Sequence, residues 1–142
     1  MANGWAAWPS LPDMSTDHRN RLGALGERLA EAHLIAGGYR VLERNFRTRH
    51  GELDLVVSDS RCLVFCEVKT RLGGAATGPY APLVSVGLSK RRRLRSLAAE
   101  WLSERPARLR LEGGEELRFD AIGVLLRRDG SVVALEHVED AF

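Results

Sequence analysis

The sequence predicts a single α/β domain in which a mixed β-sheet packs against flanking helices. One observation is the order of periodic segments, which reads helix, three strands, helix, two strands. A second is composition: 142 residues, 44% hydrophobic and 28% charged, can build one core without crosslinks. We expect this domain to occupy residues 17–142. Residues 1–16 show no periodicity and form a tail, either loose or docked on the surface, to which we assign no function.

The first expected helix runs from about Asp17 to Ala36, where Gly37-Gly38 supplies a stop. Apolar residues recur along it at helical spacing and predict its core stripe: Leu22, Leu25, Leu29, Ala32 and Ala36. Glu27 lies opposite that stripe, beside the small residues Gly23 and Ala30, where another backbone could approach closely. An exposed helical glutamate is the simpler interpretation of Glu27.

Three strands are expected next, near Tyr39 to Arg44, Glu52 to Ser58 and Cys62 to Thr70. The third is nearly continuous in apolar residues, which is typical of a central strand covered on both faces. The turn-like residues 58–61 predict a hairpin between the second and third strands. Cys62 and Cys66 would lie about 13 Å apart on one strand, which predicts buried thiols and no disulfide.

Residues 71–80 are rich in glycine and predict a mobile loop. The second expected helix runs from about Ser89, a good N-cap, to Ser103. Its core stripe consists of Leu94, Leu97, Ala98, Trp101 and Leu102.

Two alternating segments, Leu117 to Leu126 and Ser131 to Val138, flank the hairpin turn Asp129-Gly130 and predict the last two strands. Asp120 in the first segment is interpreted as a surface residue at a strand end, or else as an outer carboxylate near the site. Glu136, His137 and Glu139 are interpreted as polar residues of an edge strand, without a function.

Glu67-Val68-Lys69, at the end of the apolar third strand, is the most informative stretch. Because successive strand residues face opposite ways, Glu67 and Lys69 share a face and Val68 points to the other. The predicted hairpin would bring Asp54 close to Glu67. Two carboxylates beside one ammonium suit Mg²⁺ or Mn²⁺ and the cleavage of phosphodiester bonds. The simpler interpretation is an exposed Glu-x-Lys pair on the strand rim.

Several motifs together resemble the small bacterial YraN-type family, which similarity places in the restriction-endonuclease-like superfamily, near archaeal Holliday-junction resolvases. The resemblance spans about residues 19 to 126. It is carried by Asn45-Phe46-Arg47, Gly51 to Leu55, Val64 to Arg71, Lys90 with Leu94, and Arg118-Phe119-Asp120. One departure is visible, because the Pro-Asp signature of the superfamily is Leu53-Asp54 here. The metal needs only the carboxylate, so this departure leaves the chemistry intact.

The resemblance implies a restriction-endonuclease-like layered fold with a mixed central sheet. It also implies a catalytic set of Asp54, Glu67 and Lys69. Asp54 and Glu67 would hold Mg²⁺ or Mn²⁺, Glu27 would assist from the first helix, and the Val68 carbonyl would complete the coordination. Lys69 would handle the nucleophile.

The net charge is only +2, yet cations cluster around the expected site. We expect Arg47, Arg49, Lys90 and Arg91 to hold nucleic-acid phosphates, although charge runs are often solvated helix faces. No motif for reading bases in a groove is present, so low sequence specificity is expected. The sequence has no stretch long enough to span a membrane and no secretory signal, so no membrane partner and a cytoplasmic location are expected.

Three function hypotheses remain. The first is a metal-dependent endonuclease acting on DNA, more than on RNA, or on structured nucleic acid. The second is a non-catalytic nucleic-acid-binding or assembly module on the same fold. The third is a homodimeric interaction protein that retains acidic residues, and a homodimer would also suit an enzyme that cuts paired strands.

Overall fold

A computed structural model of the chain describes residues 16–73, 88–105 and 116–142. Within these ranges, helices and strands follow one another in the predicted order. They are α2 (Thr16–Ala36), β1 (Arg40–Thr48), β2 (Gly51–Ser58), β3 (Cys62–Leu72), α3 (Leu88–Ser103), β4 (Glu116–Leu126) and β5 (Val132–Val138). Residues 1–15 of the predicted tail and residues 74–80 of the predicted loop lie outside the described residues. Arg71 and Leu72 extend β3 instead.

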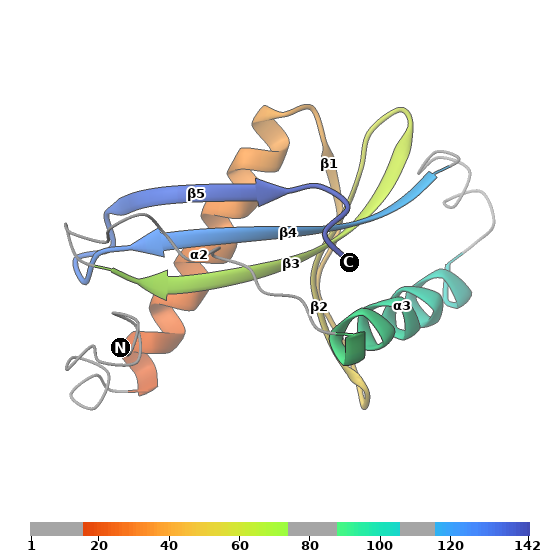
Figure 1. Ribbon diagram of the computed structural model, residues 1–142, viewed down its shortest axis with the longest axis horizontal. Helices are drawn as coiled ribbons and strands as arrows, with labels where there is room; N and C mark the ends of the chain where they lie inside the picture. The colour runs from red at the N-terminus through yellow and green to blue at the C-terminus, as the bar shows by residue number, and fades with distance from the viewer. Residues whose placement is uncertain (1–15, 74–87, 106–115) are drawn as a thin grey trace.

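The strands form one mixed sheet in the order β1-β2-β3-β4-β5. β3 and β4 are parallel from Cys62 with Glu116 to Leu72 with Leu126, and the other neighbours are antiparallel. In Figure 1, α2 crosses one face of the sheet, whereas α3 lies beside the steeply turned β1–β2 hairpin. The protein is therefore an α/β protein with helices flanking a mixed sheet, as predicted, and β3 is its central strand.

Each face of the sheet has its own hydrophobic core. The face toward α2, here called the α2 face, buries Leu22, Ala30, Leu34, Leu55, Val57, Cys62, Val64, Cys66, Ile122, Val124 and Leu126. The face toward α3, here called the α3 face, buries Leu53, Val56, Leu63, Phe65, Leu94, Leu97, Ala98, Trp101, Phe119, Ala121 and Phe142. Alternate residues of β3 enter the two cores, which explains why that strand is apolar without a break.

The core stripe of α3 is confirmed, but the stripe predicted for α2 is partly wrong. The row that α2 buries is Leu22, Gly26, Ala30 and Leu34, which recur every four residues. Ala32 and Ala36 are exposed. In the middle of this row the helix has the small residues Gly26 and Ala30, and the sheet approaches closely at Gly26. Glycine has no apolar side chain, so hydrophobic spacing alone did not identify this row in the sequence.

Several strand limits differ slightly from the prediction. β1 continues past Arg44 to Thr48, because it pairs with β2 along its whole length up to the pair Thr48 and Gly51. The turn before β5 is confirmed, with Gly130 at a φ of 89° and a 2.8 Å hydrogen bond from the Arg127 N–H to the Ser131 carbonyl. Both cysteines are buried and free, as predicted. Within the described ranges, no helix is long and apolar enough to cross a membrane.

Candidate functional site

The candidate site lies where β2 separates from β3. The two strands pair from Ser58 with Leu63 to Leu55 with Cys66. Beyond that point, a side chain replaces the backbone ladder: Asp54 Oδ2 accepts a 2.7 Å hydrogen bond from the backbone N–H of Val68. The predicted hairpin is therefore confirmed, and it ends with the Asp54 carboxylate against β3.

Asp54 also marks a reversal of the strand faces. Leu53 packs in the core of the α3 face and Leu55 in that of the α2 face, although residues two apart on a regular strand share a face. On β1, Asn45 lies between the residues paired with Leu55 and Leu53, and its φ is 50°. This left-handed conformation is uncommon outside glycine, and asparagine tolerates it better than most residues. Both strands thus twist sharply at one level, and the Asp54 carboxylate turns toward α2.

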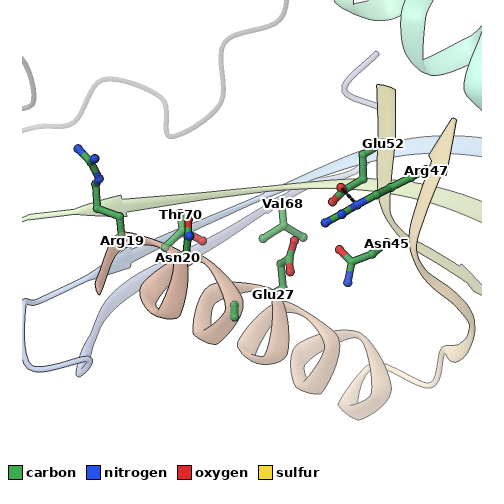
Figure 2. A pocket seen from close by; sticks show the side chains of 10 residues that line it. Arg19, Asn20, Glu27, Asn45, Arg47, Glu52, Val68 and Thr70 are labelled. Atoms are coloured by element: carbon green, nitrogen blue, oxygen red, sulfur yellow. Dashed lines mark hydrogen bonds and ion pairs between the residues drawn. The ribbon is translucent and has the colours of Figure 1, made fainter. Parts of the chain in front are cut away.

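Three carboxylates meet at this level. Glu27 of α2 and Glu52 and Asp54 of β2 each offer an oxygen, and these oxygens lie within 4.8 Å of one another. Figure 2 shows Glu27 rising from α2 toward Val68, with Glu52 nearby and bonded to Arg47. All three residues are half-buried. This acidic cluster, Glu27, Glu52 and Asp54, could hold a metal ion.

The acidic cluster is electrostatically unfavourable by itself. Burial, and after it the charges of Glu27, Glu52 and Glu67, raise the pKa of Asp54 to about 7, against the hydrogen bond from Val68. Burial and the charge of Glu52 likewise raise the pKa of Glu27, which Arg47 only partly offsets. A bound divalent cation would reverse these effects, because an opposite charge favours ionised carboxylates.

Close helix packing brings Glu27 to the cluster. A Cβ atom at Gly26 would lie 1.9 Å from Oγ1 of Thr70 on β3, so only glycine allows this approach. The neighbouring Glu27 is thereby held over the separation of β2 and β3. The cavity in front of the cluster has a volume of about 540 Å³ and is lined by Arg19, Asn20, Gly23, Ala24, Glu27, Asn45, Arg47, Glu52, Val68 and Thr70.

Glu67 and Lys69 form a second group beside the α3 face. Lys90 of α3 places its Nζ 2.7 Å from Oε2 of Glu67, and these side chains are only 18% and 16% exposed. Burial lowers the pKa of Lys69, and the neighbouring Lys90 lowers it further. As predicted, Glu67 lies on the face opposite Val68, which packs in the α2-face core. The structure brings Asp54 together with Glu27, whereas Glu67 and Lys69 gather around Lys90.

The predicted phosphate-binding arginines are distributed differently. Arg47 lines the cavity, and its Nε donates a 2.6 Å hydrogen bond to Oε2 of Glu52. Arg49 and Arg91 are exposed and are not among the residues that line the cavity. Lys90 points toward Glu67, as its position on the same side of the helix as Leu94 predicted.

Sequence reasoning gave no role to Glu52 or Asn45. The signal for Glu52 was present, because Glu52 and Asp54 are two apart on a predicted strand and so share a face. Asn45 gave no signal, since an isolated left-handed residue inside a strand has no pattern.

The interpretation of Asp120 as a surface residue was wrong. Asp120 is fully buried. It accepts two 2.8 Å hydrogen bonds from Arg118, one of 3.0 Å from the Asp140 N–H, and pairs with Nε2 of His137 at 2.8 Å. A buried carboxylate needs such partners, and His137 is therefore not a solvated edge residue.

The sequence comparisons identify the family. The model of the uncharacterised protein family UPF0102 matches residues 26–124. The chain belongs to this family. A UPF0102 protein of Frankia alni is 44% identical, over 91% of this chain and 100% of its own. UPF0102 proteins of Frankia casuarinae and Pelotomaculum thermopropionicum are 46% and 44% identical, over 87% and 89% of this chain and 98% of each relative. The resemblance to the YraN-type family is thus confirmed.

Among solved structures, the chain is similar to Pyrococcus furiosus SfsA in complex with Ca²⁺. The TM-score is 0.33 at 14% identity, and the match covers 81% of this chain and 62% of SfsA. The family match does not assign an activity to UPF0102 proteins, so function must be argued from the acidic cluster.

Proposed function

We propose that this UPF0102 protein is a metal-dependent endonuclease that hydrolyses phosphodiester bonds in DNA or structured nucleic acid with low sequence specificity. The observation that carries this proposal is the acidic cluster of Glu27, Glu52 and Asp54. Half-buried carboxylates this close together are costly unless a cation joins them. Oxygen ligands of this kind suit Mg²⁺ or Mn²⁺, with waters and substrate oxygens in the remaining positions.

When bound, Mg²⁺ or Mn²⁺ supplies Lewis-acid charge at the scissile phosphate and makes the attacking water more acidic. Asp54, Glu27 and Glu52 would hold it, each through a carboxylate oxygen. Arg47 and Arg19 line the same cavity and provide positive charge for a phosphate group. In this arrangement the water gives up one proton as its oxygen bonds to phosphorus, one phosphorus–oxygen ester bond breaks, and the departing oxygen takes up a proton.

Lys69 belongs to the neighbouring group around Lys90 and is not among the residues that line the cavity, and we assign it a role toward this proton. Burial and the neighbouring Lys90 lower its pKa, so it gives up a proton more readily than a solvated lysine. Its ammonium form also stabilises charge that builds on the phosphoryl oxygens. Arg91, exposed on α3, then holds a more distant phosphate, and Lys90 does so when its ammonium leaves Glu67.

The alternative is a non-catalytic nucleic-acid-binding module, and one observation favours it. The ion pair with Lys90 occupies the carboxylate of Glu67, which the sequence assigned to the metal and which the acidic cluster does not include. If cleavage requires Glu67 as a further ligand and the pair persists on nucleic acid, binding without cleavage is the outcome.

Cleavage assays separate the two functions. Plasmid, single-stranded DNA, four-way junction DNA and RNA are incubated with protein and Mn²⁺, Mg²⁺ or EDTA. Asp54→Asn and Lys69→Met are the test variants, and Asp17→Asn, an exposed carboxylate in the first turn of α2, is the matched control. Metal-dependent nicking by the wild type and Asp17→Asn, with none by Asp54→Asn or Lys69→Met, supports the nuclease. Binding without cleavage under every metal supports the module.

A further inference from the structure

A second polar group lies outside the acidic cluster, where α2 meets β5. His33 in the last turn of α2 and His137 of β5 are 104 residues apart, yet His33 Nε2 lies 3.0 Å from His137 Nδ1. The two rings meet edge to face at 79°. His137 Nε2 pairs in turn with the buried Asp120 at 2.8 Å. The proposed hydrolysis uses none of these three side chains.

Asp120 decides which nitrogen of His137 carries the proton. Burial by itself raises the pKa of Asp120, but hydrogen bonds from His137, Arg118 and the Asp140 backbone outweigh it and lower the pKa below its ordinary value. An ionised carboxylate only accepts hydrogen bonds, so His137 Nε2 must be the donor. In neutral His137, Nδ1 therefore accepts a hydrogen bond from His33 Nε2–H, and a metal ion would replace that hydrogen bond, with the proton of His33 moving to its own Nδ1. A histidine backed by a carboxylate in this way is the usual arrangement of a metal-binding imidazole.

His33 completes a pair of nitrogen ligands at the surface. Its side chain is exposed, which leaves an entry path and room for water. Burial and the neighbouring His137 lower the pKa of His33, which favours the neutral imidazole, the form that coordinates metals. The last turn of a helix also favours a cation, because the helix dipole is negative there.

The chemistry of the donor atoms indicates the kind of ion. Imidazole ligands suit Ni²⁺, Cu²⁺ and Zn²⁺, whereas carboxylate clusters suit Mg²⁺ and Mn²⁺.

We propose that His33 and His137 bind a divalent transition-metal ion of the nickel and copper type, with Asp120 as the positioning residue for His137. The ion joins the C-terminal end of α2 to β5. This site is independent of the proposed nuclease function, since it shares no ligand with the acidic cluster.

Calorimetric titration with Ni²⁺ tests the site on the full chain, prepared without an affinity tag. His33→Gln is the test variant, because its amide can still form a hydrogen bond with His137 while it coordinates nickel poorly. His50→Gln is the matched control, since His50 is an exposed histidine paired with a single carboxylate, Glu100. We expect His33→Gln to weaken nickel binding at least tenfold and His50→Gln to change it less than twofold. Equal affinity in the wild type and His33→Gln, or no saturable binding by the wild type, overturns the proposal.

A further variant separates this site from the acidic cluster. In Asp54→Asn, nickel should bind as in the wild type and should raise the unfolding temperature equally, because ligands of the folded state stabilise it. In His33→Gln that temperature should not respond to nickel. Binding that is lost in Asp54→Asn and kept in His33→Gln would place the ion at the acidic cluster and refute the histidine site.

Discussion

Asp54 and Val68 are joined by a hydrogen bond of 2.7 Å from the Val68 backbone N–H to the Asp54 carboxylate, at the point where β2 and β3 stop pairing. The bond fixes the carboxylate of one strand against the backbone of the next and turns it toward Glu27 of α2. The acidic cluster therefore depends on where the hairpin ladder ends.

The stability of the metal-free protein should fall as the pH rises from about 4 to about 7. Burial and the surrounding carboxylates raise the pKa of Asp54 to about 7, so the folded state binds this proton more tightly than the unfolded state. Stability from this group is complete below the unfolded pKa near 4 and is lost as the pH passes the folded value. Asp54→Asn should remove this dependence and stabilise the protein at pH 8, by on the order of 2 to 4 kcal/mol at most.

Urea unfolding of wild type and Asp54→Asn at pH 5 and pH 8, with EDTA present, measures the effect. Asp17→Asn is the control, because Asp17 is exposed on α2. If the free energy of unfolding changes between pH 5 and pH 8 by the same amount in the wild type and in Asp54→Asn, Asp54 is not the source of the pH dependence.

Gly26→Ala should destabilise the protein, whereas Gly23→Ala should not. A Cβ atom at Gly26 would overlap Thr70, which we expect to cost about 1 to 3 kcal/mol by overpacking. At Gly23 no atom lies within 4 Å, so alanine should add about 0.5 to 1 kcal/mol through its helix propensity. Chemical denaturation of both variants measures these differences.

The double variant Gly26→Ala/Thr70→Ala checks the cause. Removing the Thr70 side-chain atoms beyond Cβ should recover part of the lost stability, giving a positive coupling energy between the two sites. Additive effects would mean that the close approach of α2 to β3 is not what Gly26 permits.

The ion pair of Glu67 and Lys90 should stabilise the docking of α3. Lys90→Met leaves Glu67 without its ion-pair partner and with Lys69 as a cationic neighbour, and we expect a loss of about 1 to 3 kcal/mol, because a buried carboxylate that is only partly compensated is costly. Glu67→Gln/Lys90→Met should be more stable than Lys90→Met. Thermal unfolding of the wild type, Glu67→Gln, Lys90→Met and the double variant gives a double-mutant cycle. If the double variant is the least stable of these four proteins, the ion pair does not stabilise the fold.

The order of the elements and the two-sided core could be predicted from the sequence because period-two and period-3.6 patterns are local signals. The face of Asp54 could not, because the reversal between Leu53 and Leu55 depends on twisting together with Asn45 on the neighbouring strand. The burial of Asp120 on β4 depends on His137 of β5, and only the pairing of these two strands brings the two residues together. The role of Gly26 also depends on a distant residue, because its missing side chain lets α2 approach Thr70 of β3.

Mn²⁺ titration into wild type and Asp54→Asn by calorimetry tests the central claim, that the acidic cluster is a metal site. We predict one saturable Mn²⁺ site in the wild type, weakened as the pH falls from 8 to 6 because protons compete for Asp54. In Asp54→Asn the affinity should fall at least tenfold, while Asp17→Asn should bind as the wild type does. Equal affinity in the wild type and Asp54→Asn, or no binding by the wild type at pH 8, would contradict the account.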